Sequence, residues 1–127
     1  MSSILIKSAT VVNENKQYVA DLLVKDGFIE RIDSSINAAS DKVINAEGLY
    51  LLPGCIDDQV HFREPGLTYK ADIHSESRAA VAGGITSFME MPNTIPNALT
   101  IELLEEKYKI ASENSLANYS LANRVRW

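Results

Sequence analysis

The sequence predicts an α/β protein in which a β-rich N-terminal segment, residues 1–52, precedes the first βα units of a (β/α)8 barrel, residues 53–127. Two observations predict this class. Short apolar and β-branched runs separated by turn residues fill the first segment, which is typical of part of a β-sandwich. After Pro53 and Gly54 the order becomes strand, loop, helix, strand, loop, helix, strand, which is typical of parallel strands joined by crossover helices.

The N-terminal segment shows no helical periodicity. Its expected strands span residues 3–12, 19–24 and 28–32, and a further strand pair spans 43–52. Asp26 and Gly27 form the dipeptide that favours a tight hairpin turn between the second and third strands. Glu47 and Gly48 are expected near the turn of the last pair. Residues 33–42 are rich in Ser, Asn and Asp and are expected to form a loop.

The second segment is expected to alternate strands and helices. The predicted strands are 55–61, 85–91 and 116–121, and the predicted helices are 73–82 and 101–112. Gly83 and Gly84 are expected to end the first helix, and Thr100 is expected to cap the second. Charged residues of the second helix, Lys107 among them, are expected to be solvated, because the apolar residues Ile101, Leu104, Tyr108 and Ala111 share the other face. Cys55 is expected to be a small core residue.

The length of this segment predicts a truncated barrel. A parallel sheet must be covered on both faces or closed into a barrel, and a (β/α)8 barrel needs about 250 residues. Fewer than 75 residues follow Pro53, and residues 123–127 carry no cap or stop signal. A complete small α+β domain is the alternative.

Composition excludes several classes of function. The 127 residues include 12 Lys and Arg against 17 Asp and Glu, a net charge of −5 that argues against nucleic-acid binding. No apolar run reaches roughly 18 residues, so no membrane span is expected, and the first residues lack the pattern of a secretory signal. The single cysteine, Cys55, cannot form an internal disulfide, which favours a reducing, cytoplasmic setting.

Two polar segments follow predicted barrel strands, where the chemistry of such barrels is found. They are residues 57–66, DDQVHFREPG, and residues 91–94, MPNT. Asp57, Gln59 and His61 alternate along the strand end and are expected to face one way. A neutral imidazole at the mouth of a barrel is a natural ligand for a divalent metal, and a histidine hydrogen-bonded in the core is the alternative.

The same two segments resemble a known family. The run PGCIDDQVHFREPG, residues 53–66, resembles the amidohydrolase opening P-G-x-I-D-x-H-x-H in its dihydroorotase version, H-x-H-F-R-E-P-G. The run AAVAGGITSFMEMPNT, residues 79–94, resembles the next block of that family. The resemblance implies a metal-dependent (β/α)8 barrel flanked by a β-sandwich. Arg63 and Asn93 favour dihydroorotases over allantoinases and hydantoinases.

Roles follow from the resemblance for three residues. His61 would be a metal ligand, with Zn²⁺ expected at about two ions per complete site. Arg63 would pair with the carboxylate of dihydroorotate, because a planar guanidinium can bind a carboxylate with two hydrogen bonds. Asn93 would donate its amide to the same carboxylate. The alternative for Arg63 is a loop salt bridge, for example to Glu64. For Asn93 it is an Asx turn after Pro92, which is compatible with the substrate role.

Gln59 is the departure from the family pattern. It stands where the family has the first histidine of H-x-H, and an amide oxygen is a poorer ligand for Zn²⁺ than imidazole. Three outcomes are open: the metals are kept by ligands elsewhere, one metal is held well, or catalysis has been lost. The rest of the motif is intact, which favours a working enzyme. His74 lies outside both blocks and is expected to have a surface or capping role.

The implied function is that of a dihydroorotase, which interconverts dihydroorotate and N-carbamoyl-aspartate in pyrimidine biosynthesis. The resemblance places the other metal ligands and the general-base aspartate on later strands, so no catalytic residue is assigned within this chain and residues 1–127 alone are expected to be inactive. The alternatives are a non-catalytic subunit that supports aspartate transcarbamoylase, or another cyclic amidohydrolase such as an allantoinase or hydantoinase. A homodimer or an aspartate transcarbamoylase complex is the expected assembly.

Overall fold

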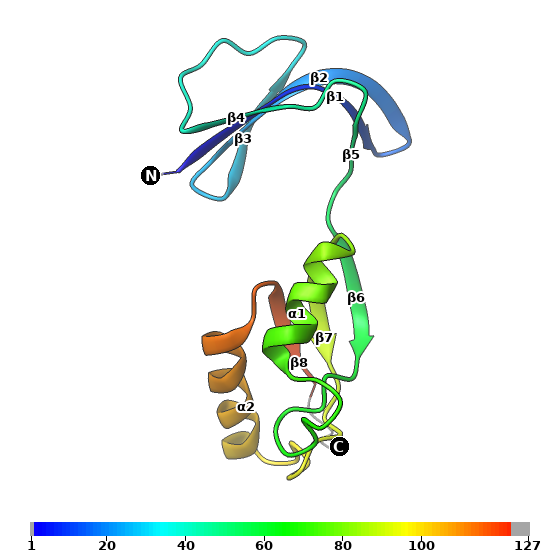
Figure 1. Cartoon of the computed structure of the whole chain (residues 1–127), viewed down its shortest axis with the longest axis vertical. Helices are drawn as coiled ribbons and strands as arrows, with labels where there is room; N and C mark the ends of the chain where they lie inside the picture. Colours follow the sequence, from blue (N-terminus) through cyan, green and yellow to red (C-terminus); the bar gives the residue numbers. More distant parts are fainter. Residues whose placement is uncertain (1, 123–127) are drawn as a thin grey trace. The chain divides into compact units, whose positions relative to one another are not determined.

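The computed structural model describes residues 2–122, and the chain divides into two compact units, Met1–Pro53 and Gly54–Trp127 (Figure 1). Both units contain sheets, and the second adds helices, which confirms the α/β class. The second sheet of a sandwich and the closure of a barrel stay predictions. Residues 123–127, where no cap signal was expected, lie outside the described part.

The first unit is one five-stranded sheet. Its strands are β1 (Ser3–Asn13), β2 (Lys16–Lys25), β3 (Phe28–Asp33), β4 (Lys42–Asn45) and β5 (Tyr50–Leu51). The order is β3-β2-β1-β4, and β5 also pairs with β1. The turn between β2 and β3 has positive φ angles at Asp26 (50°) and Gly27 (83°), as the predicted tight hairpin requires. Leu5, Leu23 and Ile36 form the core of this unit.

The expected pairing of β4 with β5 is wrong. Both strands lie parallel to β1, with Ile4 opposite Lys42 and Thr10 opposite Tyr50. The register of β1 shifts between Ile6 and Ala9, where Ser8 has a positive φ of 58°. This bulge divides β1 into two halves, each of which pairs with its own short strand.

As far as residue 122, the second unit is a parallel sheet with two helices. Its elements are β6 (Cys55–Val60), α1 (Ile73–Ala82), β7 (Ile85–Glu90), α2 (Ile101–Asn114) and β8 (Asn118–Leu121). The strand order is β6-β7-β8, and both strand pairs are parallel. The bounds predicted for α1 are confirmed, and Thr100 caps α2 as predicted. Neither helix in residues 2–122 is long and apolar enough to span a membrane.

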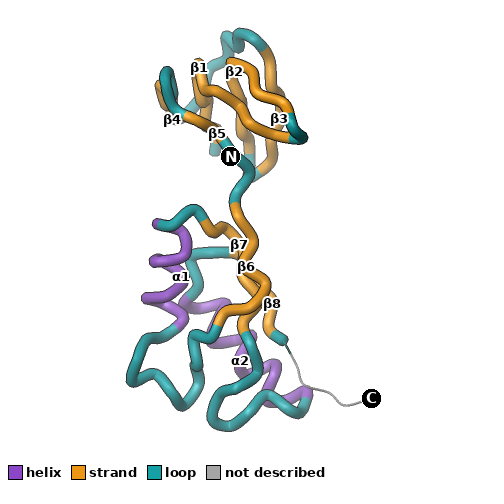
Figure 2. The backbone as a smooth tube through the Cα atoms, turned by 90° about the vertical axis from the view of Figure 1, so that its right-hand side faces the viewer, coloured by secondary structure: helices purple, strands orange, loops and turns teal. Residues whose placement is uncertain are grey.

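The helices pack on the sheet around an aromatic core. α1 contacts β7 and α2, and α2 contacts β8 (Figure 2). The rings of Phe62 and Phe88 lie 4.7 Å apart between their centroids, and Ile73, Ala111, Ala117 and Leu121 complete the cluster around them. This core fixes the sheet from which the loops after β6 and β7 emerge.

Two expectations about burial are wrong. Lys107 of α2 was expected to be solvated, but its side chain is fully buried, because the Glu90 carboxylate at the end of β7 pairs with its ammonium. Cys55 was expected in the core but is exposed. It begins β6, and neither α1 nor α2 contacts this strand.

Candidate functional site

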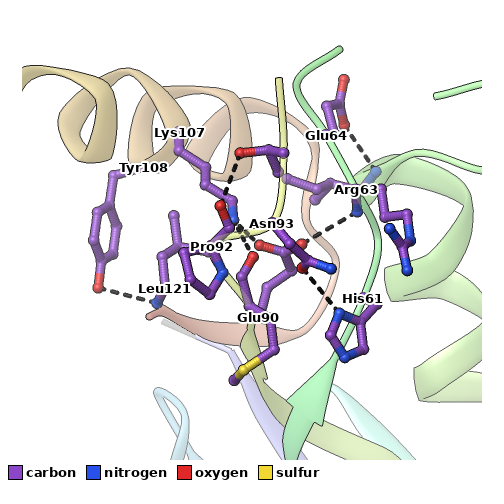
Figure 3. Close-up of polar contacts among 12 residues, drawn as sticks. His61, Arg63, Glu64, Glu90, Pro92, Asn93, Lys107, Tyr108 and Leu121 are labelled. Carbon is purple, nitrogen blue, oxygen red and sulfur yellow. Dashed lines mark hydrogen bonds and ion pairs between the residues drawn. The ribbon is translucent and has the colours of Figure 1, made fainter. Parts of the chain in front are cut away.

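The loops that follow β6 and β7 carry the candidate residues, and backbone hydrogen bonds join them. The Met91 N–H donates to the Val60 carbonyl at 3.0 Å, and the Ile95 N–H donates to the Pro65 carbonyl at 3.0 Å. Parallel strands bring their carboxyl ends to one edge of a sheet, so residues 61–66 and 91–96 become neighbours although they are far apart in sequence. Figure 3 shows this region.

His61 and Asn93 are brought into contact. The imidazole Nδ1 of His61 lies 2.9 Å from the carboxamide Oδ1 of Asn93 (Figure 3). The carboxamide oxygen carries no hydrogen, so Nδ1 must donate, and the lone pair of the neutral ring is then on Nε2. The Asn93 Nδ2 remains a donor for another group. This contact takes the place of the Asx turn considered for Asn93.

Arg63 lies in the first loop with an unusual backbone. Its φ is 65°, in the left-handed region, and its N–H donates to Glu90 Oε1 at 3.2 Å. The salt bridge considered for Arg63 and Glu64 does not form. Glu64 Oε2 instead accepts the Ile73 N–H at 2.8 Å, at the start of α1. None of the ion pairs within residues 2–122 involves Arg63.

Within residues 2–122, neither Gln59 nor His74 forms a hydrogen bond to His61 or Asn93. Gln59 is exposed on β6, and its backbone N–H donates to Asp57 Oδ1 at 3.1 Å. The β6–β7 ladder is irregular between Asp57 and Val60. His74 is exposed in the first turn of α1, with its Nδ1 3.2 Å from the Arg78 guanidinium. The surface position expected for His74 is confirmed.

Sequence reasoning missed two residues beneath the loops. Glu90 and Lys107 are fully buried and form an ion pair, and the Lys107 Nζ donates to the Met91 carbonyl at 2.7 Å (Figure 3). Burial lowers the pKa of Lys107 to about 8, which still leaves its ammonium protonated at neutral pH. The available signal was an acidic residue ending the otherwise mostly apolar run ITSFME.

The described residues do not fit a metal ion on their own. Within residues 2–122 no group of three His, Cys, Asp or Glu side chains is placed to hold one. His61 offers one imidazole nitrogen, and the amide of Gln59 cannot supply a second. What this region does offer is a guanidinium, a carboxamide donor and an imidazole at the ends of β6 and β7, a set suited to a carboxylate ligand.

Sequence comparison identifies relatives over most of the chain. The profile of the Dihydro-orotase-like family matches residues 48–120. A dihydroorotase of Carboxydothermus hydrogenoformans is 46% identical over 117 residues, which cover 88% of this chain and 27% of the relative. A dihydroorotase of Streptococcus pyogenes is 41% identical over 122 residues, which cover 94% of this chain and 29% of the relative. These matches confirm the resemblance that the two sequence blocks indicate.

Structural comparison gives a neighbour with the same fold. L-hydantoinase from Arthrobacter aurescens superposes with a TM-score of 0.90 at 30% sequence identity, over 95% of this chain and 27% of that one. The chain thus spans little more than a quarter of the length of the proteins that it matches.

Proposed function

Because the chain belongs to the Dihydro-orotase-like family of cyclic amide hydrolases, we propose that the whole protein is a cytoplasmic dihydroorotase of pyrimidine biosynthesis. The reaction is the reversible hydrolysis of dihydroorotate to N-carbamoyl-aspartate. One observation supports a dihydroorotase rather than another cyclic amide hydrolase of the family. Arg63 and Asn93 lie on neighbouring loops that are hydrogen-bonded to each other. A dihydroorotase must recognise a carboxylate that hydantoins lack, and these two side chains suit that group.

The two side chains would divide the recognition of the substrate. The Arg63 guanidinium would bind the carboxylate with two hydrogen bonds, since no carboxylate within residues 2–122 forms an ion pair with it. The Asn93 Nδ2 would donate to the same group, while its Oδ1 stays on His61. Together they would orient the ring so that its amide faces the reacting groups of the whole protein.

We also propose a role for His61 at a Zn²⁺ site. Its Nε2 has the lone pair that a zinc ligand needs, and Asn93 fixes that tautomer from the other side of the ring. The other ligands and the general-base aspartate would come from outside the described residues. Gln59 would at most be a weak ligand, so metal analysis of the whole protein, with Gln59→His as the comparison, tests how many ions are held.

Two other functions have an observation in their favour. The structural similarity to L-hydantoinase favours a related cyclic diamide without a carboxylate as substrate. Gln59, in place of a metal-binding histidine, favours a non-catalytic subunit that assembles with aspartate transcarbamoylase. The dihydroorotase proposal is preferred because the carboxylate-binding pair is intact. A homodimer is the assembly proposed for the active protein.

The test is turnover of dihydroorotate and of hydantoin by the whole protein, with Arg63→Met and with Arg78→Met as the matched control on the surface of α1. We expect Arg63→Met to lower kcat/KM for dihydroorotate by roughly 10- to 150-fold, the loss of a charged hydrogen-bonded contact of ~1.5–3 kcal/mol, and Arg78→Met to have little effect.

Each other result selects an alternative. Turnover of hydantoin but not dihydroorotate would replace the proposal by the hydantoinase function. No turnover of either substrate, together with co-purification of aspartate transcarbamoylase, would replace it by the non-catalytic subunit. Equal kinetics of the Arg63→Met variant and the wild type would remove Arg63 from the substrate site.

A further inference from the structure

A buried ion pair lies directly beneath the two candidate loops. Glu90 is the last residue of β7, and Lys107 lies in the second turn of α2. Both side chains have no exposed surface, and the Glu90 carboxylate contacts the Lys107 ammonium. Neither side chain can reach a ligand, so the pair can act on a substrate only through the residues that it holds.

The stability of the fold does not explain this pair. Removing two charges from water is costly, and mutual attraction often does no more than offset that cost. Well-packed apolar side chains of similar volume are often equally stabilising in such a position. The apolar cluster of Phe62, Phe88 and Leu121 is part of the same unit. The polar contacts of the pair therefore call for another explanation.

Those contacts reach both loops. Glu90 Oε1 accepts the N–H of Arg63 at 3.2 Å, and Lys107 Nζ donates to the carbonyl of Met91 at 2.7 Å (Figure 3). Arg63 has a φ of 65°, in the left-handed region, which is unfavourable for a residue other than glycine. A contact must hold it there. Met91 lies two residues before Asn93, so the second contact fixes the start of the other loop.

We propose that Glu90 and Lys107 form a positioning pair, which sets the backbone of Arg63 and of Met91 so that the Arg63 and Asn93 side chains meet one substrate carboxylate. The inference rests on the proposed function for its kinetic consequence. Its structural part, that the pair holds the Arg63 amide, stands independently. The residues are positioning residues and take no part in the reaction themselves.

The experiment compares two double variants of the whole protein that differ only in the side chain at position 90. Glu90→Met with Lys107→Met removes both charges and the acceptor at similar volume. Glu90→Gln with Lys107→Met also removes both charges but restores an amide oxygen that can accept the Arg63 N–H. Lys109→Met, at an exposed position of the same helix, is the matched control. The readouts are KM, kcat and amide hydrogen exchange at Arg63.

We expect the Met/Met variant to raise KM for dihydroorotate roughly tenfold or more, with a smaller change in kcat, and to accelerate exchange at Arg63. The Gln/Met variant should recover slow exchange at Arg63, and Lys109→Met should match the wild type. A merely structural pair would lower the midpoint of unfolding without this selective change in KM. An unchanged KM and unchanged exchange in the Met/Met variant would overturn the proposal.

Two results separate this inference from the proposed function. If the wild type does not turn over dihydroorotate, the proposed function is refuted, and amide hydrogen exchange at Arg63 alone tests the positioning role. Faster exchange in the Met/Met variant and slow exchange in the Gln/Met variant would support that role. Unchanged exchange in the Met/Met variant would refute it. If neither double variant folds, exchange in the wild type decides instead. Fast exchange at Arg63 in the native protein would show that Glu90 does not hold this amide.

Discussion

At the scale of single residues, the two histidines of the chain lie in opposite hydrogen-bond environments. His61 Nδ1 faces the Asn93 carboxamide oxygen, which can only accept. His74 Nδ1 faces the Arg78 guanidinium, which can only donate. The neutral rings must therefore be opposite tautomers, with the proton on Nδ1 of His61 and on Nε2 of His74. The His61 tautomer is the one that leaves Nε2 able to bind a ligand.

We predict that this difference is visible in one spectrum. Imidazole ¹⁵N chemical shifts of the neutral rings should identify the Nδ1–H tautomer for His61 and the Nε2–H tautomer for His74. Asn93→Ala should shift His61 toward the Nε2–H form and leave His74 unchanged. Identical tautomers for the two rings in the wild type would contradict the His61–Asn93 contact.

At the scale of elements, the two candidate loops approach each other closely at Gly66. Its φ is 85°, and a Cβ built on it would lie 2.1 Å from the carbonyl oxygen of Ile95. The same two loops share the hydrogen bond from the Ile95 N–H to the Pro65 carbonyl. A residue larger than glycine would force the loops apart, and the backbone oxygen that it meets cannot rotate away as a side chain could.

We predict that Gly66→Ala is more harmful than Gly84→Ala, which is the matched control. Gly84 has a similar φ of 90°, but a Cβ added there would meet nothing within 4 Å. The backbone strain alone should lower the free energy of unfolding by roughly 1–3 kcal/mol in both variants. Gly66→Ala should add the cost of the overlap with Ile95. Denaturant unfolding measures the difference, and equal losses would show that the loops separate freely.

Local signals explain which elements the sequence could predict. The glycines at 83 and 84 and the cap at Thr100 are properties of a few consecutive residues, and the helix ends that they indicate are confirmed. The pairing of β4 and β5 with β1 depends on a bulge at Ser8 that no local pattern indicates. Lys107 was misplaced because a charged residue on an amphipathic helix normally faces water, and its partner Glu90 is distant in sequence.

For the candidate site, too, the sequence predicts the local features but not the contacts between distant residues. His61, Arg63 and Asn93 follow strands within recognisable motifs, so the sequence could predict their neighbourhood. The contact of His61 with Asn93 joins residues 32 positions apart, and the left-handed backbone of Arg63 is contacted by Glu90 at the end of β7. Such contacts between residues far apart in sequence leave no local sequence pattern, so the sequence alone does not decide between the alternatives for Arg63 and Asn93.

At the scale of the whole molecule, each of the two units has a core of its own. In the first unit, a buried carboxylate also links separate segments through hydrogen bonds. Asp21 of β2 accepts the N–H of Ser8 at 2.8 Å and that of Ile36 at 2.9 Å, and its carboxylate lies 3.7 Å from the Lys7 ammonium. The pKa of Asp21 lies below its usual value of 3.8, mainly because its carboxylate accepts the Ile36 and Ser8 amides. The positive charge of Lys7 lowers this pKa further.

This pKa has a consequence for stability that is confined to one unit. Because the native state holds the charged form more strongly than the unfolded chain, the contribution of Asp21 is complete above about pH 4 and is lost as the pH falls through the lowered pKa. We predict that Asp21→Asn weakens hydrogen-exchange protection of residues 3–51 at pH 7 and reduces the further loss on acidification to pH 3. Residues 55–121 serve as the internal reference, and Asp33→Asn, at the exposed end of β3, is the matched control. Equal loss of protection in both units, or wild-type acid sensitivity in the Asp21→Asn variant, would show that this carboxylate does not stabilise the first sheet.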